Sequence, residues 1–132
     1  MKDPKLLETM KEYKGRDEVP ADFDSFWDQA LANLAELPEY KLEEQDFSIP
    51  NVHCYELTFK GTRDGLVYAR VVFPKTDQKV PVIFHFHGYM GRCWDWTDML
   101  AYTAAGYGVV SMDVRGQSGY STDGVRSPLG NT

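Results

Sequence analysis

Two histidines and a glycine end an apolar run in the stretch Phe84-His85-Phe86-His87-Gly88-Tyr89. In open α/β sheets, ligands bind at the carboxyl ends of strands, so a loop that starts here is well placed for chemistry. Backbone N–H groups in such a loop can stabilise a developing alkoxide. We therefore predict that the N–H of Tyr89 is an oxyanion-hole donor in a loop formed with His87 and Gly88. Hydrogen bonds of His87 would order this loop, an interpretation compatible with the first.

The spacing of His85 and His87 also suggests a metal site, because alternate residues of a strand point to the same face. A third ligand is hard to find, since Asp113, after the next apolar run, is the one candidate at a suitable place. Two imidazoles need further ligands to hold a metal ion, so we predict no metal and no other cofactor.

A second polar motif, Asp113-Val114-Arg115-Gly116-Gln117-Ser118-Gly119, also follows an apolar run. One interpretation is a loop that borders an active site, beside the first loop. The other, which we favour for Asp113 and Arg115, is a supporting turn held by an ion pair between these two side chains. Gly116 and Gly119 would supply the positive φ angles of such a turn.

Neither Ser118 nor Ser121 fits the requirements of a catalytic nucleophile. The Gly-x-Ser-x-Gly elbow requires a glycine two residues after the serine, and Tyr120 occupies that position for Ser118. The elbow also requires a strand directly before the serine and a helix directly after it. The Gly- and Ser-rich segment around both serines predicts neither element.

Helices are predicted in the first part of the chain. Apolar residues recur at helical spacing over residues 6–14 and, more regularly, over residues 23–37. Asp22 is the expected N-cap of the second helix and Pro38 its expected end. We expect the apolar side of this helix to pack on the sheet of its own domain, with binding to a partner's groove as the alternative.

Strands are predicted over residues 52–60 and 66–73, joined by a Gly- and Asp-containing turn into an antiparallel pair. A nearly continuous apolar run over residues 80–86 predicts a strand buried on both faces. A helix over residues 94–105 and a strand over residues 107–112 complete a β-α-β unit, which favours parallel pairing. We expect this last strand to form an exposed edge, which would make the isolated chain poorly soluble.

Composition and charge restrict the possible functions. The 132 residues include 20 Asp and Glu against 14 Lys and Arg, for a net charge of −6, which disfavours binding to a nucleic-acid backbone. No apolar run approaches the roughly 20 residues of a membrane span. The charged residues 1–15 do not form a signal peptide. We therefore expect a cytoplasmic protein in which Cys54 and Cys93 are reduced.

Four segments resemble the acetyl xylan esterase / cephalosporin C deacetylase family of α/β-hydrolases. They are PADFDSFWDQALANL, YELTFKGTRDGLVYARVVFPK, FHFHGYMG and YTAAGYGVVSMDVRGQSGYSTD. The last is specific to this family, whereas the His-Gly loop suits many hydrolases. The resemblance implies the N-terminal portion of an α/β-hydrolase fold. Residues 1–50 would be an N-terminal helical segment, and residues 51–132 the first half of the sheet, with an antiparallel hairpin leading into parallel strands.

The resemblance also implies a function. The family consists of metal-independent, intracellular carboxylesterases, typically hexameric, that deacetylate small sugars such as xylo-oligosaccharides, and also cephalosporin C. It implies that the N–H of Tyr89 is one oxyanion-hole donor and that Arg115-Gly116-Gln117 lines or braces the site. The implied partners are a small acetylated sugar or ester and further copies of the same chain, with no nucleic acid and no membrane.

The catalytic Ser, Asp and His of this family follow the Arg-Gly-Gln segment in the chain. No position in residues 1–132 receives any of the three. We therefore expect the nucleophile, acid and base beyond residue 132, and an incomplete, inactive α/β-hydrolase domain here. Two other interpretations stay open. One is a non-catalytic module that binds sugars or esters, and the other is a structural half that needs a second chain carrying the nucleophile.

Overall fold

The computed structural model describes residues 4–34 and 38–124. The chain divides into two units, with the boundary after Leu34. The first unit holds two helices, α1 (Pro4–Glu12) and α2 (Phe23–Ala32). In the parts of the chain that the structure describes, neither these helices nor any other is long and apolar enough to cross a membrane.

The helix α2 begins where the sequence predicts and ends earlier. Asp22 occupies the N-cap position, but its side chain makes no capping hydrogen bond. Its backbone carbonyl accepts hydrogen bonds from the Phe26 N–H at 2.8 Å and the Ser25 hydroxyl at 3.0 Å instead. The helix ends at Ala32, and residues 35–37 of the predicted helix lie outside the described residues. Packing of α2 on the sheet stays a prediction.

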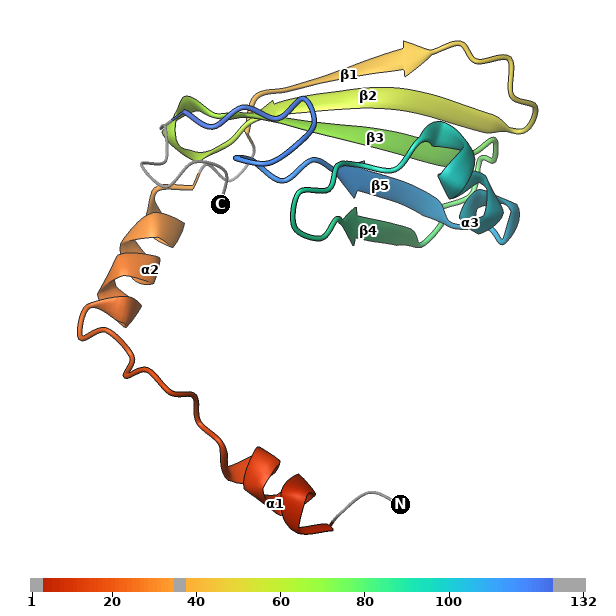
Figure 1. Ribbon diagram of the computed structural model, residues 1–132. Coiled ribbons are helices and arrows are strands. Elements are labelled where there is room, and N and C mark those ends of the chain that lie inside the picture. Colours follow the sequence, from red (N-terminus) through yellow and green to blue (C-terminus); the bar gives the residue numbers. More distant parts are fainter. Residues whose placement is uncertain (1–3, 35–37, 125–132) are drawn as a thin grey trace. The chain divides into compact units, whose positions relative to one another are not determined.

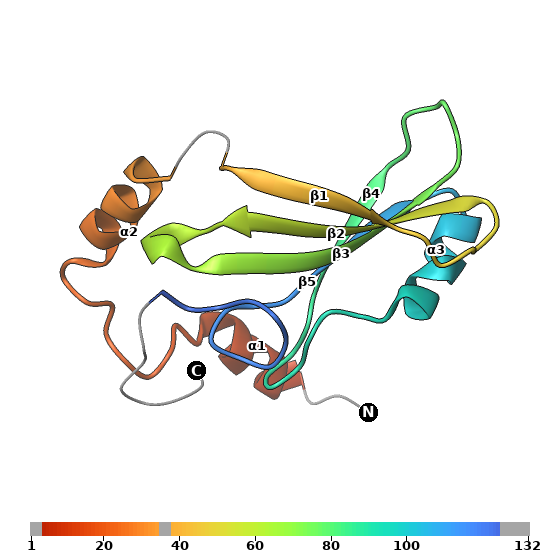
Figure 2. The same cartoon turned by 90° about the horizontal axis from the view of Figure 1, so that it is seen from above.

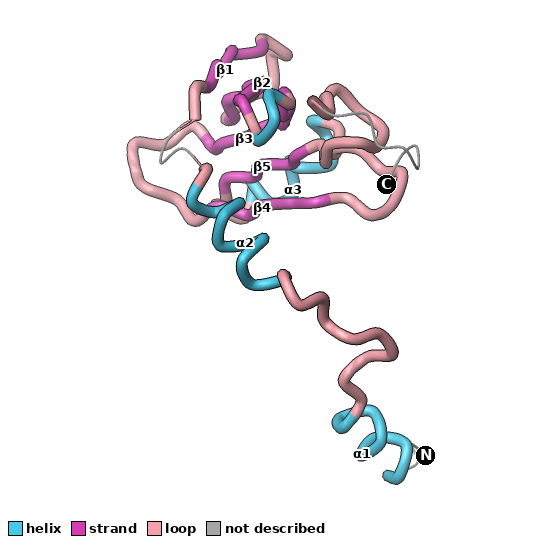
Figure 3. Tube along the Cα trace, turned by 90° about the vertical axis from the view of Figure 1, so that its left-hand side faces the viewer, coloured by secondary structure: helices cyan, strands magenta, loops and turns pink. Residues whose placement is uncertain are grey.

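The second unit is built on a mixed sheet whose five strands lie side by side (Figures 1 and 3). In chain order they are β1 (Tyr40–Gln45), β2 (Val52–Lys60), β3 (Leu66–Pro74), β4 (Val82–Phe86) and β5 (Gly108–Met112). Their spatial order is β1-β2-β3-β5-β4, and all neighbours are antiparallel except β4 and β5. The predicted antiparallel pair and the predicted parallel unit are therefore both confirmed.

The first strand, β1, corrects the expectation that residues 1–50 are helical. It pairs with β2 along its whole length, from Tyr40 opposite Phe59 to Gln45 opposite Cys54. The stretch Tyr-Lys-Leu-Glu-Glu-Gln has few apolar residues, and five of its six side chains are exposed. An exposed edge strand of this kind has no apolar alternation that sequence patterns could detect.

The strand β5 lies inside the sheet, between β3 and β4. The expectation of an exposed edge at residues 107–112 is therefore wrong, because the crossover returns the chain to the side of β4 that faces β3. Among the described strands, β4 is the open edge on that side, and Phe84 and Phe86 are exposed. The prediction that residues 80–86 are buried on both faces is wrong as well. In this unit only the face with Ile83 and His85 is partly covered.

The crossover from β4 to β5 covers one face of the sheet and forms the core there. It contains a 3-10 turn, η2 (Trp96–Met99), followed by α3 (Leu100–Ala104), so the predicted helix over residues 94–105 is shorter than expected. Gly106, with a φ of 87°, follows the C-cap residue of this helix. The buried side chains of this core are Cys54, Val72, Met99 and Val109, with Ile49, Val52, Trp94, Trp96 and Leu100 packed around them.

The segment after β5 curves back toward the turn that joins β2 and β3 (Figure 2). The Thr122 N–H donates to the Leu66 carbonyl at 2.8 Å, and the Leu66 N–H donates to the Thr122 hydroxyl at 3.0 Å. The Tyr68 N–H donates to the Ser121 hydroxyl at 2.8 Å. These bonds satisfy backbone groups at the start of β3, where β5 does not pair with it. They also fix the far end of the loop that starts at Asp113.

Replacing Val72 by Ala should lower the free energy of unfolding by about 2 kcal/mol, because two buried methyl groups are lost and a cavity is left behind. Val72 is 0% exposed. The matched control is Val19→Ala, since Val19 is 74% exposed and its truncation should change stability by less than about 0.5 kcal/mol. Denaturant unfolding of the two variants measures the difference. Equal losses in both would contradict the assigned core.

Candidate active site

The loop that leaves β4 makes a tight turn at residues 88–91. The Gly91 N–H donates to the Gly88 carbonyl at 3.0 Å, which closes the turn around Tyr89 and Met90. Met90 has a φ of 59°, in the left-handed region that non-glycine residues rarely adopt. A positive φ at the third residue is the signature of a type II turn. For a side chain such as that of Met90, this conformation costs on the order of 1 kcal/mol, so other contacts must hold it.

The loop after β5 supplies two such contacts. The Gln117 Oε1 accepts a hydrogen bond from the Met90 N–H at 2.6 Å. The His87 Nε2 lies 2.9 Å from the Val114 N–H and accepts its hydrogen. Because Nε2 accepts, the ring proton sits on Nδ1, which donates to the Gly88 carbonyl at 2.8 Å. His87 is therefore a neutral imidazole with both nitrogens engaged, and it connects the two loops.

The backbone N–H of Tyr89 takes part in none of these contacts. Within the described residues no acceptor takes its backbone N–H, and the residue as a whole is 77% exposed. Its neighbours on both sides are held, because His87 and the turn bond fix Gly88 while Gln117 fixes Met90. A free N–H in a fixed turn has the geometry that an oxyanion donor needs, since no reorganisation is required when charge develops.

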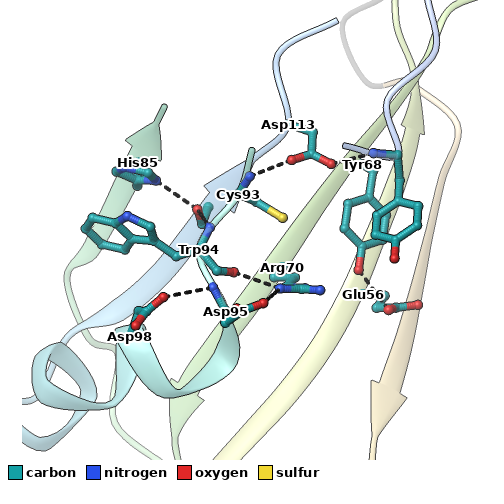
Figure 4. A network of polar contacts seen from close by, with 11 residues as sticks. Glu56, Tyr68, Arg70, His85, Cys93, Trp94, Asp95, Asp98 and Asp113 are labelled. Carbon is teal, nitrogen blue, oxygen red and sulfur yellow. Dashed lines mark hydrogen bonds and ion pairs between the residues drawn. The ribbon is translucent and has the colours of Figure 1, made fainter. Parts of the chain in front are cut away.

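Asp113, which is completely buried, connects the loop of Tyr89 to the loop of Gln117. Figure 4 shows its carboxylate beside Cys93. One carboxylate oxygen accepts the Cys93 N–H, and the other accepts the Tyr120 N–H at 2.7 Å. Its backbone carbonyl accepts the Ser121 hydroxyl at 2.7 Å. Burial and then hydrogen bonding to Asp113 raise the pKa of the Cys93 thiol to about 12, so this thiol is protonated at neutral pH.

The expected ion pair between Asp113 and Arg115 is not present, which corrects the prediction of a turn held by these two side chains. Arg115 donates to the carbonyl and to the hydroxyl of Thr62, in the turn between β2 and β3, and lies 3.9 Å from Asp123. Asp113 is satisfied by backbone N–H groups, which bind a buried carboxylate without a second buried charge. The positive φ angles of Gly116 and Gly119, 75° and 112°, are as expected.

His85, which the sequence suggested as a metal ligand, lies in hydrogen-bond contact with a serine that no sequence motif singled out. The Ser111 Oγ is 2.8 Å from the His85 Nδ1 and accepts the Trp94 N–H at 2.9 Å. The His85 ring stacks on Trp94 with centroids 3.6 Å apart. Burial, with a smaller effect from His87, lowers the pKa of His85. Ser111 is 0% exposed, so no substrate reaches it, and the pair is a structural contact.

Ser118 and Ser121, in the loop after β5, are also unsuited to nucleophilic attack. The Ser121 hydroxyl donates to the Asp113 carbonyl and accepts from the Tyr68 N–H. Ser118 has no histidine partner among the residues that the structure describes. Activation of a serine requires a base within hydrogen-bond reach. The structure therefore brings the predicted loop residues together without placing an activated serine among them.

The histidines do not converge on a common point. His85 faces Ser111, and both nitrogens of His87 are engaged by backbone groups. In the described ranges, no group of three His, Cys, Asp or Glu residues could hold a metal ion. A cavity of about 570 Å³ lies beside Val52 and Lys75, where β2 begins and β3 ends, at the opposite end of the sheet from these loops.

Sequence reasoning missed two residues that hold this region, Ser111 and Arg70. Ser111 interrupts the apolar run of β5, and Arg70 interrupts that of β3. A polar residue inside an otherwise apolar strand must find a hydrogen-bond partner when it is buried. A polar residue that interrupts an apolar run was therefore the sequence signal that could have identified both residues. The sequence alone does not show which hydrogen-bond partner each of them has.

Replacing Gly119 by Ala should destabilise the protein strongly, because the new Cβ would lie 2.2 Å from the Asp113 carboxylate. The matched control is Gly106→Ala, which also has a positive φ but meets nothing within 4 Å. The control should cost about 1 kcal/mol from backbone strain alone, and Gly119→Ala should cost at least about twice that. Denaturant unfolding compares the two. Equal costs would contradict the close approach of Gly119 to Asp113.

Known proteins share both the sequence pattern and the fold. A model of the acetyl xylan esterase family (AXE1) matches residues 1–132. The crystal structure of acetyl xylan esterase 1 from Thermoanaerobacterium sp. JW/SL YS485 is 42% identical, with a TM-score of 0.83, over 96% of this chain and 40% of that one. An acetyl xylan esterase from Paenibacillus sp. R4 is 28% identical, with a TM-score of 0.73, over 89% of this chain and 39% of that one.

The chain therefore spans about 40% of the length of these two enzymes. Within that span, the mixed sheet corresponds to the N-terminal part of their structures. Because the family model matches every residue and the fold is shared, the chain belongs to the acetyl xylan esterase family.

Proposed function

We propose that residues 1–132 supply one oxyanion-hole donor, the N–H of Tyr89, to a carboxylesterase that deacetylates small acetylated sugars. The observation that carries this proposal is the N–H of Tyr89, which no described residue accepts, in a turn whose flanking residues are fixed. Membership of the acetyl xylan esterase family supports acetyl-ester hydrolysis as the reaction. Action on xylo-oligosaccharides or on cephalosporin C rests on the family resemblance.

The proposed role of Tyr89 is electrostatic. When a nucleophile attacks the acetyl carbonyl, negative charge develops on the carbonyl oxygen, and a rigid donor stabilises this charge more than it stabilises the neutral ester. The loss of one such donor typically lowers kcat by about 10²–10³-fold. The contacts of His87 and Gln117 matter in this proposal because they hold the donor in place before the charge appears.

We further propose that the nucleophile, the acid and the base come from outside residues 1–132. Two serines of the site region support this proposal, because neither is available as a nucleophile. Ser111 is buried, and the Ser121 hydroxyl is engaged by two backbone groups. In the complete enzyme, an activated serine would approach the turn at residues 88–91 from the open side, where Tyr89 is exposed. The acyl-enzyme would then be hydrolysed by water with the same oxyanion donor in place.

Acetate release by the polypeptide encoded by the complete reading frame tests this function. With 4-nitrophenyl acetate and acetylated xylotriose, we expect turnover that a serine-directed sulfonyl fluoride abolishes, while residues 1–132 alone give none. No turnover by the complete polypeptide, together with calorimetric binding of acetylated xylotriose, would establish a non-catalytic binding module instead. Turnover by residues 1–132 alone would contradict the proposed division of catalytic groups.

Gln117→Met should lower kcat by about 10-fold or more, with KM within about twofold, because Met90 loses the acceptor that holds its strained conformation and Tyr89 is no longer fixed. Gln117→Glu keeps an oxygen acceptor and should retain more activity. The control is Gln78→Met, because Gln78 lies in an exposed loop away from the site. Steady-state kinetics with 4-nitrophenyl acetate measures all three. Activity of Gln117→Met equal to that of the control would contradict the role of Gln117.

A further inference from the structure

A half-buried arginine contacts the far end of the loop that carries Tyr89. Arg70 lies in the middle of β3, and its side chain is only 15% exposed. Its Nη1 donates to the Trp94 carbonyl at 3.1 Å and forms an ion pair with the Asp95 carboxylate. Figure 4 shows the guanidinium reaching from β3 to the segment just before η2. The guanidinium carbon also lies 5.4 Å from the centre of the Trp96 ring.

This arginine is energetically expensive, which indicates a specific role. Burying a guanidinium costs several kcal/mol unless its charge and its N–H groups are paired. Burial opposes the charge of Arg70, but hydrogen bonds with Tyr68 and Asp95 outweigh it and raise the pKa above its usual range. The Nε of Arg70 is buried and has no hydrogen-bond partner among the described residues. The side chain thus points toward Trp94 and Asp95, and in this position its Nε–H has no acceptor among the described residues.

The residues held by Arg70 belong to a short segment that is fixed at each position. The Cys93 N–H is bound by Asp113, and the Trp94 N–H by Ser111. Arg70 adds the Trp94 carbonyl and the Asp95 side chain. All three anchoring side chains come from β3 or from the end of β5, in the interior of the sheet.

The loop from His87 to Asp95 is therefore held at both ends. At its start, His87 and Gln117 connect it to the loop after β5. At its end, Arg70 connects it to β3, a strand that is otherwise remote from the loop in the sequence. A displacement of about 1 Å at a catalytic donor can lower the rate by about 100-fold. The contact of Arg70 with Trp94 and Asp95 thus restricts the position of Tyr89 from a distance.

We propose that Arg70 is a positioning residue for catalysis, which holds the loop of residues 87–95, and with it the Tyr89 N–H, against the centre of the sheet. This inference rests on the proposed esterase function. Arg70 touches no reacting atom in this role. A lysine would keep a charge near Asp95, but it lacks the rigid guanidinium plane that directs Nη1 at the Trp94 carbonyl and the Asp95 carboxylate together, so it should replace arginine only in part.

Variants of the complete protein test this role. Arg70→Met should lower kcat for 4-nitrophenyl acetate by about 10-fold or more per titrated active site, with KM within about twofold. Arg70→Lys should recover part of this loss. Asp95→Asn should give a smaller loss of kcat, because it removes the ion pair and leaves the bond to Trp94, and Asp95 is exposed enough to tolerate the change. The control is Arg16→Met, because the Arg16 side chain is 86% exposed and pairs with the similarly exposed neighbour Asp17.

Counting active sites by burst titration separates positioning from folding, because a purely structural role would reduce the number of sites and leave kcat per site unchanged. Hydrogen exchange gives a readout that needs no activity: the hydrogen-bonded amides of Met90, Gly91, Cys93 and Trp94 should exchange at least about 10-fold faster in Arg70→Met, while those of β2 stay protected. If Arg70→Met does not fold, Asp95→Asn and Arg70→Lys carry the test.

Wild-type kcat per site and unchanged exchange in the folded variants would overturn the role of Arg70. A wild-type protein that releases no acetate would overturn the esterase function and, with it, the catalytic part of this role. Faster exchange of the same four amides in such a protein would still identify Arg70 as the anchor of the loop. The two failures are therefore distinguishable.

Discussion

The arrangement of the site region depends on one buried carboxylate, that of Asp113. It directly follows β5 and accepts backbone N–H groups from two loops, one at Cys93 and one at Tyr120. A buried carboxylate without these donors would carry an uncompensated charge, so both loops are required to approach it. The close contact with Gly119 leaves no room for a side chain there. Asp113 thus fixes the distance between the loop that carries Tyr89 and the loop that carries Gln117.

From this contact the remaining interactions follow in order. With the loops adjacent, His87 accepts the Val114 N–H and Gln117 accepts the Met90 N–H, which stabilises the left-handed conformation of Met90. Ser111 and Arg70 hold the segment that returns toward the crossover helix. In the turn, the N–H groups of Met90 and Gly91 are engaged, whereas no described residue accepts the N–H of Tyr89. An exposed N–H between fixed neighbours is what an oxyanion donor requires.

The sequence predicted the positions of the strands better than it predicted their order in the sheet or the contacts of polar side chains. Hydrophobic alternation located β2 and β3 within a residue, because their apolar faces are strongly patterned. It missed β1, whose charged residues carry no such pattern, and it misplaced β5 at the edge, because strand order depends on the path of the crossover. The short spacing between Asp113 and Arg115 suggested that these two side chains form an ion pair. Arg115 instead binds Thr62, more than fifty residues earlier. Long-range partners of polar side chains are decided by packing, which local patterns do not encode.

The central claim is that the backbone N–H of Tyr89 stabilises the oxyanion, and proline at this position tests it most directly. Tyr89 is the second residue of a type II turn, where the fixed φ of proline fits, so Tyr89→Pro removes the N–H with little change of backbone shape. Tyr89→Ala removes the side chain and keeps the N–H. The measurement is kcat for 4-nitrophenyl acetate in the complete protein. We expect Tyr89→Pro to be about 100-fold slower than Tyr89→Ala, and equal rates for the two variants would rule out this role of the Tyr89 N–H.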